Sequence, residues 1–268
     1  MFNIRGVIVG VMMLLATGTA SLQATELNCR GRAGHVEEFQ YSWRVRGALR
    51  WVAGLIIPTS GLGHLRTVFP AAGSSTISSE LLITAPRGKV DGFYHYQSEM
   101  EQSGLTTLMT YSGYAWGSRA RGERTSFDYA RRVARIRKET PEKVETRVKA
   151  LPEGEMRDVL TAIYFLRQNA GRITAPVTTS IYSDGKEYPV VFRPIEGKTF
   201  EIDGRHLPAR GFEIIDAPGG KTWPGNVKVY VSDDARRIPL RIDITRSISA
   251  LQLDLQSVEA CRFMQAVR

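Results

Sequence analysis

The chain of 268 residues is poor in the side chains that build reactive sites. It has two cysteines and four histidines, and His35, His64, His95 and His206 lack the i, i+4 spacing of a metal site. The sequence holds no Gly-x-Ser-x-Gly elbow, and Gly61-Leu62-Gly63 lacks the third glycine of a dinucleotide fingerprint. We therefore expect no metal, no cofactor and no catalytic residue, and interpret the chain as a non-enzyme.

Long apolar runs are equally scarce. The uncharged run at 6–16 is shorter than the roughly 20 residues that span a bilayer. A short basic segment precedes it, and small residues ending in Ala20 and Ala24 follow, which is the layout of a secretory signal peptide. We expect a signal peptide at 1–24, cleaved after Ala20 or Ala24, and one periplasmic β-rich domain at 25–268. An uncleaved N-terminal anchor is the competing interpretation.

The two cysteines, Cys29 and Cys261, stand at opposite ends of the expected mature chain. Exported proteins fold in an oxidising compartment, where a lone pair of cysteines is usually joined. We predict a disulfide that ties the first strand to the last. Two buried free thiols are the alternative.

The net charge is +9, because Lys and Arg outnumber Asp and Glu. An exported basic protein does not meet chromosomal DNA, so we expect an anionic envelope component such as a lipid headgroup as partner, and no nucleic acid. The basic residues are densest between 119 and 138. Within this segment we predict anionic-headgroup contact by Arg131, Arg132, Arg135 and Arg137. A solvated strand face is the more common role of such a run.

Short segments of alternating apolar and polar residues indicate a mainly antiparallel β protein. The alternation is clearest at 227–231, 238–244 and 251–255, so each of these strands has one buried face. Weaker strand patterns occur at 93–100, 105–116, 133–137, 144–148, 173–181 and 188–192. Turn-forming residues at 232–236 and at Asp184-Gly185 separate neighbouring segments.

One amphipathic helix is predicted amid these strands. Apolar residues recur at helical spacing: Met156, Val159, Leu160, Ile163 and Leu166. We expect Glu153 and Glu155 in its first turn, Arg167 in its last turn and Gly171 as its C-terminal cap. Such a helix should lay its apolar side on the sheet.

Several blocks resemble the exported bacterial family called domain of unknown function 3108. They are 124–129, 157–160, 164–167, 184–186 and, most specifically, 229–241. The resemblance covers about residues 93–258. It implies a curved antiparallel sheet, a half-barrel, with one or more helices packed on it, similar to lipoprotein carriers of the LolA and LolB type. The family supplies no established catalytic residues.

Aromatic residues gather on two neighbouring strand segments. Tyr94 and Tyr96 share one strand face, and Tyr114 and Trp116 share another. The functional hypothesis is that these four side chains line a concave ligand-binding surface. The competing interpretation is ordinary sheet core with cross-strand aromatic pairing.

The uncharged segment Trp51–Leu62 admits two interpretations. It is either a buried hairpin or a mobile apolar loop at the mouth of a lipid site, and buried apolar segments are the commoner case. Asp233-Asp234 resembles a paired carboxylate, but adjacent side chains of an extended chain diverge. We therefore expect a turn whose carboxylates pair with Arg236 or Arg237.

The sequence thus favours a non-enzymatic periplasmic carrier of a hydrophobic or amphipathic, lipid-like ligand, in peripheral contact with a membrane. An envelope interaction or assembly protein without a ligand cavity is the alternative. An unrecognised hydrolase ranks third, because catalytic triads assemble from residues distant in sequence.

Overall fold

The computed structural model describes residues 34–47, 59–71, 73–85, 92–116, 119–183, 185–220, 226–246 and 249–263. The expected signal peptide at 1–24 lies outside these residues, and so does most of the segment Trp51–Leu62.

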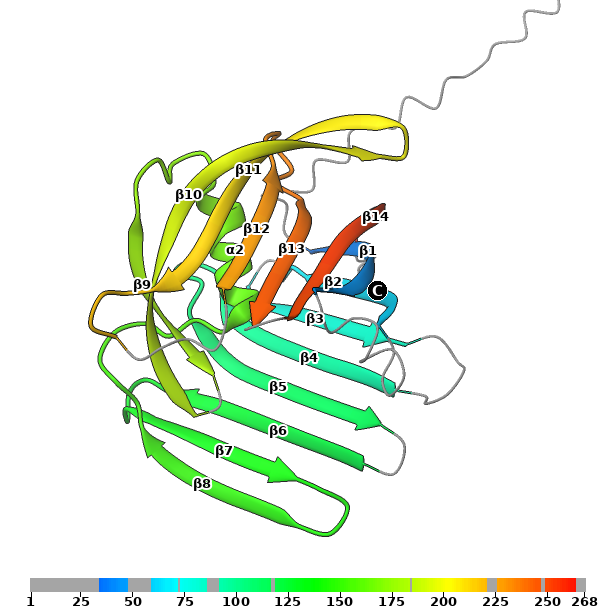
Figure 1. Ribbon diagram of the computed structural model, residues 1–268. Helices are drawn as coiled ribbons and strands as arrows, with labels where there is room; N and C mark the ends of the chain where they lie inside the picture. Colours follow the sequence, from blue (N-terminus) through cyan, green and yellow to red (C-terminus); the bar gives the residue numbers. More distant parts are fainter. Residues whose placement is uncertain are drawn as a thin grey trace, which may run out of the picture.

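Fourteen strands form one antiparallel sheet that curves but does not close (Figure 1). The first eight are β1 His35–Arg46, β2 Ser60–Val68, β3 Thr76–Thr84, β4 Gly92–Glu101, β5 Thr107–Trp116, β6 Arg119–Asp128, β7 Val133–Glu139 and β8 Val144–Ala150. The helix α2 Val159–Asn169 follows. The remaining strands are β9 Val177–Ser183, β10 Lys186–Ile202, β11 Arg205–Asp216, β12 Asn226–Ser232, β13 Pro239–Arg246 and β14 Ser249–Phe263.

The order of the strands explains the shape. Strands that are consecutive in the chain pair with one another, except that β8 does not pair with β9. The first strand, β1, pairs with the last, β14, which joins two meanders into one sheet. The edges of that sheet are β8 and β9, and the connection between them carries α2. The half-barrel expected from the sequence is confirmed.

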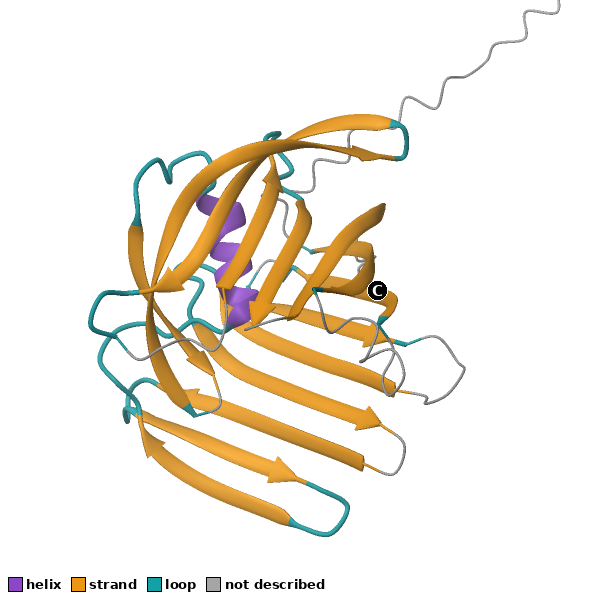
Figure 2. Cartoon of the chain, viewed as in Figure 1, coloured by secondary structure: helices purple, strands orange, loops and turns teal. Residues whose placement is uncertain are grey.

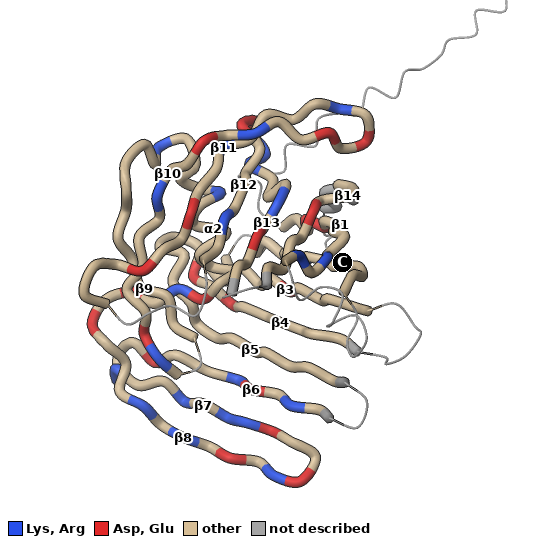
Figure 3. The backbone as a smooth tube through the Cα atoms, viewed as in Figure 1, with Lys and Arg blue, Asp and Glu red and all other residues tan. Residues whose placement is uncertain are grey.

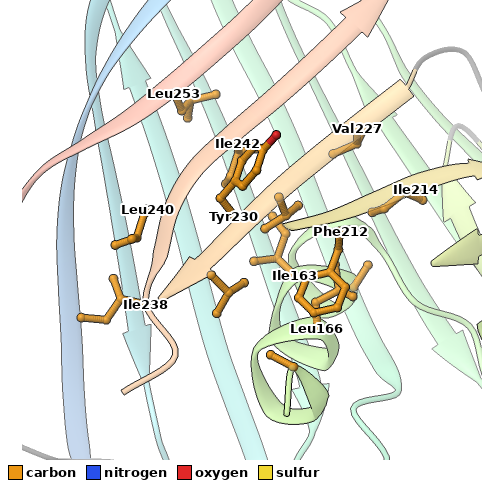
Figure 4. Close-up of a cluster of buried hydrophobic side chains, with 14 of the residues drawn as sticks. Ile163, Leu166, Phe212, Ile214, Val227, Tyr230, Ile238, Leu240, Ile242 and Leu253 are labelled. Atoms are coloured by element: carbon orange, nitrogen blue, oxygen red, sulfur yellow. The ribbon is translucent and has the colours of Figure 1, made fainter. Parts of the chain in front are cut away.

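The core lies between α2 and the curved sheet (Figure 2). Leu160, Ile163 and Leu166 of the helix are buried in one cluster with residues of both meanders. Figure 4 shows Ile163 and Leu166 together with cluster residues of β11 to β14. Buried partners on the strands include Tyr41, Leu65, Phe192, Phe212, Val229, Ile242 and Leu253. The one helix of the described chain therefore lays its apolar side on the sheet, as the sequence predicted.

The ends of α2 differ from the prediction. The helix begins at Val159 with Asp158 as N-cap, and its first turn holds no acidic residue, so the expectation for Glu153 and Glu155 is wrong. Both precede the helix, and Glu155 pairs instead with Arg157 at 3.1 Å. Ala170 is the C-cap, in a right-handed conformation, so Gly171 does not supply the left-handed cap. Arg167 does lie in the last turn.

The predicted turns are confirmed. Gly185 has a φ of +70° where β9 and β10 meet in a tight hairpin. The segment 232–236 turns the chain between β12 and β13, and Pro239 begins β13. In that turn Asp233 pairs with Arg237 at 2.7 Å and Asp234 with Arg236 at 2.6 Å, so these carboxylates serve ion pairs.

The structure does not describe the predicted disulfide. Cys29 precedes the described residues, and nothing is described of the Cys261 side chain. The backbone of β1 runs beside that of β14, with His35 opposite Phe263. This pairing brings the two terminal strands together, and the disulfide stays a prediction.

Gly61 is required where β2 passes the indole of Trp43. A Cβ on Gly61 would stand 2.1 Å from the carbonyl oxygen of Thr84 and 2.6 Å from the indole nitrogen, which donates to that same oxygen at 2.9 Å. We expect Gly61→Ala to lower the free energy of unfolding by about 1–3 kcal/mol, measured by urea denaturation. Gly63→Ala is the matched control, since its nearest neighbour is Tyr41 Cβ at 3.4 Å. Equal stabilities of the two variants would contradict this account.

Candidate functional site

The inner face of the sheet is the face that points toward α2. Three contacts define it: the Ser98 hydroxyl on β4 donates to Asp158, the Thr67 hydroxyl on β2 bonds that of Tyr164, and Phe192 on β10 lies 5.7 Å from Phe165 between ring centroids. Because side chains alternate along a strand, these contacts fix which residues of each strand face inward.

Asp158 anchors the helix start in a buried polar cluster. Its carboxylate accepts hydrogen bonds from the backbone N–H of Thr161 at 3.0 Å and from the Thr107 hydroxyl at 3.2 Å, besides that of Ser98. Burial raises the pKa of this carboxyl above its usual value, while hydrogen bonds from Ser98 and Thr161 oppose the rise. The cluster is fully occupied by internal hydrogen bonds, which is typical of a structural anchor.

Arg167 anchors the other end of the helix. Its guanidinium donates to Glu37 at 2.8 Å and to the carbonyl of Arg237 at 2.7 Å, and it lies over the ring of Tyr164. Burial alone would lower the pKa of Arg167, but the Glu37 carboxylate raises it above the ordinary value. For the Tyr164 hydroxyl, burial has the opposite effect and raises the pKa to about 12. Arg167 and Tyr164 therefore keep a fixed charge at neutral pH.

Burial decreases along the inner face with distance from α2. On β4, Met100 is fully buried, Tyr96 is half-buried, and Tyr94 at the far end is 39% exposed. Residues that face inward at the far ends of the neighbouring strands are also half-buried and apolar: Val45, Ile83, Ile244 and Leu251. The end remote from the helix is therefore an apolar surface that the described chain covers only in part. We call these residues, with Tyr94, Tyr96 and Tyr114, the open inner surface.

The structure brings three of the predicted aromatic residues together there. Tyr94 pairs across strands with Tyr114, which is 43% exposed, and the rings of Tyr94 and Tyr96 stack at 6.4 Å between centroids. The backbone of Trp116 pairs with Gly92 on β4, and nothing is described of its side chain. The ligand-binding role of these residues stays a prediction.

The predicted basic residues lie elsewhere. Ala134 and Ile136 face inward, so Arg135 and Arg137 between and after them point to the outer face of β7. Arg131 and Arg132 belong to the turn from β6 to β7. Figure 3 shows the concentration of basic residues on β6, β7 and β8. None of the four therefore joins the tyrosines on the inner face, and their headgroup contact stays a prediction.

Sequence reasoning missed two features of the inner face. Arg121 lies beside Tyr114 across the β5–β6 pair and contacts Glu123 at 3.3 Å, so it is a basic group next to the tyrosines. The apolar residues at the far ends of β1 and β3 were missed as well, although the alternation of Phe39, Tyr41 and Trp43 was a readable signal.

Two other surface features lie outside the open inner surface. A polar hollow of about 390 Å³ beside the last turns of α2 is lined by Ser103, Gly104, Phe165, Gln168, Asn169 and Arg172. On the outer face, Leu62, Leu82 and Phe93 are 66%, 36% and 45% exposed on three adjacent strands. In the described part of the chain, His, Cys, Asp and Glu form no group of three that would hold a metal ion, and no helix has the length and apolarity to cross a membrane.

The curved open sheet with an inner helix defines the class, a half-barrel protein. The chain belongs to the family described as protein of unknown function (DUF3108), whose model matches residues 80–256, so the resemblance inferred from the sequence is confirmed. No curated protein matches the sequence.

Two solved structures match this chain in a comparison of structures. A beta-barrel-like protein of the DUF1849 domain family from Brucella abortus has a TM-score of 0.54 and 7% identity, over 85% of this chain and 97% of that one. The lipoprotein LppX of Mycobacterium tuberculosis has a TM-score of 0.26 and 13% identity, over 86% of this chain and 88% of that one. The first similarity shows a shared fold.

Proposed function

We propose that this protein is a non-enzymatic binder or carrier of a hydrophobic or amphipathic ligand in the cell envelope, held on the open inner surface. The observation that carries the proposal is the burial gradient on the inner face. Apolar side chains continue along β3, β4, β13 and β14 to the end where the helix no longer covers them. Incompletely buried apolar surface on the concave side of a rigid sheet is typical of a ligand site.

The polar part of the ligand would meet basic side chains. Arg121 lies at the rim of the open inner surface, next to Tyr114, and its charge suits an anionic head. The outer arginines of β7 and of the turn before it suit peripheral contact with an anionic membrane during loading or delivery. An exported, periplasmic location accords with this role and rests on the predicted signal peptide.

The experiment is mass spectrometry of solvent extracts from protein purified gently from the periplasm, against a control exported protein. We expect a lipid in stoichiometric amount from the wild type. The Tyr94→Ser/Tyr114→Ser double variant should lose it and bind a fluorescent long-chain fatty acid at least about tenfold more weakly, because two aromatic contacts are lost. A wild-type protein that carries no ligand and does not bind the fatty acid would contradict the proposal.

Phe93→Ser is the matched control. Phe93 adjoins Tyr94 and is similarly exposed, at 45% against 39%, but it points to the outer face. Its replacement should leave ligand binding unchanged. Equal loss of ligand from both variants would mean that general destabilisation, and not the inner surface, explains the result.

The exposed outer residues Leu62, Leu82 and Phe93 favour a second candidate, an envelope assembly protein that docks through this face. The same pair of variants separates the candidates. Docking would be weakened by Phe93→Ser and left intact by the tyrosine changes.

A further inference from the structure

The two edges of the sheet differ in how they are covered. The edge of β9 is covered at Ile181, where Arg157 forms a parallel bridge and exchanges backbone hydrogen bonds with Ser180 at 3.2 Å and Tyr182 at 2.8 Å. On the other side, β8 ends the sheet, and in the described chain no segment pairs with its outer edge. Figure 1 shows β8 at the lower margin of the sheet. An uncovered strand edge is a template for pairing with another strand.

The register of the β7–β8 hairpin shows which backbone groups face this edge. Thr140 and Lys143 exchange backbone hydrogen bonds at 2.8 and 3.3 Å, and the ladder continues without a shift to Ala150. Hydrogen-bonded pairs alternate in an antiparallel ladder, so residues 145, 147 and 149 bond to β7. The N–H and C=O groups of Val144, Thr146 and Val148 therefore point outward from the sheet.

The side chains of β8 are complementary to those of a second, antiparallel copy of β8. If a second β8 runs antiparallel with Thr146 opposite Thr146, each Val144 meets the other copy's Val148 and each Glu145 meets the other copy's Arg147. The valines, 58% and 62% exposed in the single chain, share the outer face, and the charged residues share the inner face. In this register the outward N–H and C=O groups of Val144, Thr146 and Val148 form hydrogen-bonded pairs with those of the second copy.

We propose that the β8 edge is a homodimerisation surface, which pairs with β8 of a second copy around a two-fold axis at Thr146. Cross-strand pairs of valine, threonine and opposite charges are each favourable. Lys143 and Lys149 oppose one another at the ends of the seam, where Lys143 pairs with Glu145 and Lys149 donates to the Gly185 carbonyl at 2.9 Å. Centring the axis on Arg147 instead would set two guanidinium groups against each other.

Repulsion between the Arg137 residues of the two copies does not prevent the β8–β8 contact. Arg137 lies opposite Thr146 within one chain, so the two Arg137 residues would stand three strand spacings apart, about 14 Å. That distance exceeds the Debye length of about 8 Å at physiological ionic strength. Each Arg137 also pairs with Glu139 at 2.7 Å. One short strand pair is a small interface, so we expect a concentration-dependent dimer. The proposal does not depend on what the inner face binds.

The first test is register-specific cross-linking of the full chain under mild oxidation, analysed on non-reducing gels against the wild type. Thr146→Cys should yield a covalent dimer, because Cα atoms of a hydrogen-bonded pair lie about 5.5 Å apart, within reach of a disulfide. Val144→Cys is the control, since four residues separate the two copies of this position along the seam, about 13 Å. Equal cross-linking of both, or preferential cross-linking of Arg147→Cys, overturns the register.

The second test is a charge swap followed by sedimentation equilibrium. Glu145→Arg should weaken the dimer at least about tenfold, because it sets like charges opposite one another twice. Adding Arg147→Glu restores opposite charges in the same register and should restore the dimer. A wild type that stays monomeric at its highest soluble concentration, together with no Thr146→Cys dimer, overturns the proposal.

Discussion

Arg167→Met is expected to lower the free energy of unfolding by about 3–5 kcal/mol. The guanidinium lies 2.8 Å from the Glu37 carboxylate, and the two side chains are 7% and 12% exposed. It also satisfies backbone carbonyls of the turn after β12. Methionine fills similar space, but it leaves a carboxylate desolvated without its partner. Urea denaturation monitored by circular dichroism measures the loss.

A neighbouring ion pair provides the matched control. Arg66 bonds Glu38 at 3.2 Å, but Arg66 is 43% exposed, so Arg66→Met should cost less than about 1 kcal/mol. The double variant Arg167→Met/Glu37→Met should recover part of the loss, because it removes the uncompensated charge. If Arg167→Met costs no more than Arg66→Met, the buried pair does not hold the helix to β1.

The part of the fold that the sequence predicts is the part with regular alternation. The strands around 227–231, 238–244 and 251–255 are present as β12, β13 and β14, because their apolar residues alternate without interruption. The helix was found from its spacing. Its start was placed too early, because acidic residues before a helix resemble those of a first turn until the N-cap at Asp158 is known.

Two of the strands before residue 85, β2 and β3, were missed for physical reasons. β2 carries Gly61 and Gly63 on its inner face, and glycine is rare in strands, but here it makes room for Trp43 and Tyr41. In β3, the inner Ser79 interrupts the apolar alternation, and it is buried because the Thr67 hydroxyl bonds it at 3.0 Å. Both patterns are explained only by neighbouring strands.

The candidate site was predictable in part for the same reason. The tyrosines were visible as an aromatic cluster, and alternation placed Tyr94 and Tyr96 on one face. Which face is concave depends on where the helix packs, and that depends on contacts between residues far apart in sequence, such as Ser98 with Asp158. The arginines of β7 were predicted as headgroup contacts, and the alternation along β7 sets them on the outer face, away from the tyrosines.

Asp158→Ala is the second change for which we expect a large effect, about 2–4 kcal/mol of lost stability. The substitution removes an N-cap, which costs about 1 kcal/mol, and removes the carboxylate that accepts from the buried hydroxyls of Ser98 and Thr107. Asp158→Asn should cost much less, since the amide oxygen still accepts from the Thr161 N–H. The free energy of unfolding in urea measures both. Equal losses for the two variants would contradict the capping role.

The pH dependence of the same position follows from its pKa. Burial raises the pKa of Asp158 above its unfolded value of 3.8, so the folded chain holds this proton more tightly than the unfolded chain. The associated stability is fully present below pH 3.8 and is lost as the pH rises through the folded-state pKa. The stability of the wild type relative to Asp158→Asn should therefore fall from acid to neutral pH, because asparagine does not titrate. Unfolding free energies of the two proteins across this range measure the trend, and a difference that is flat or rises with pH would show that burial does not govern this carboxyl.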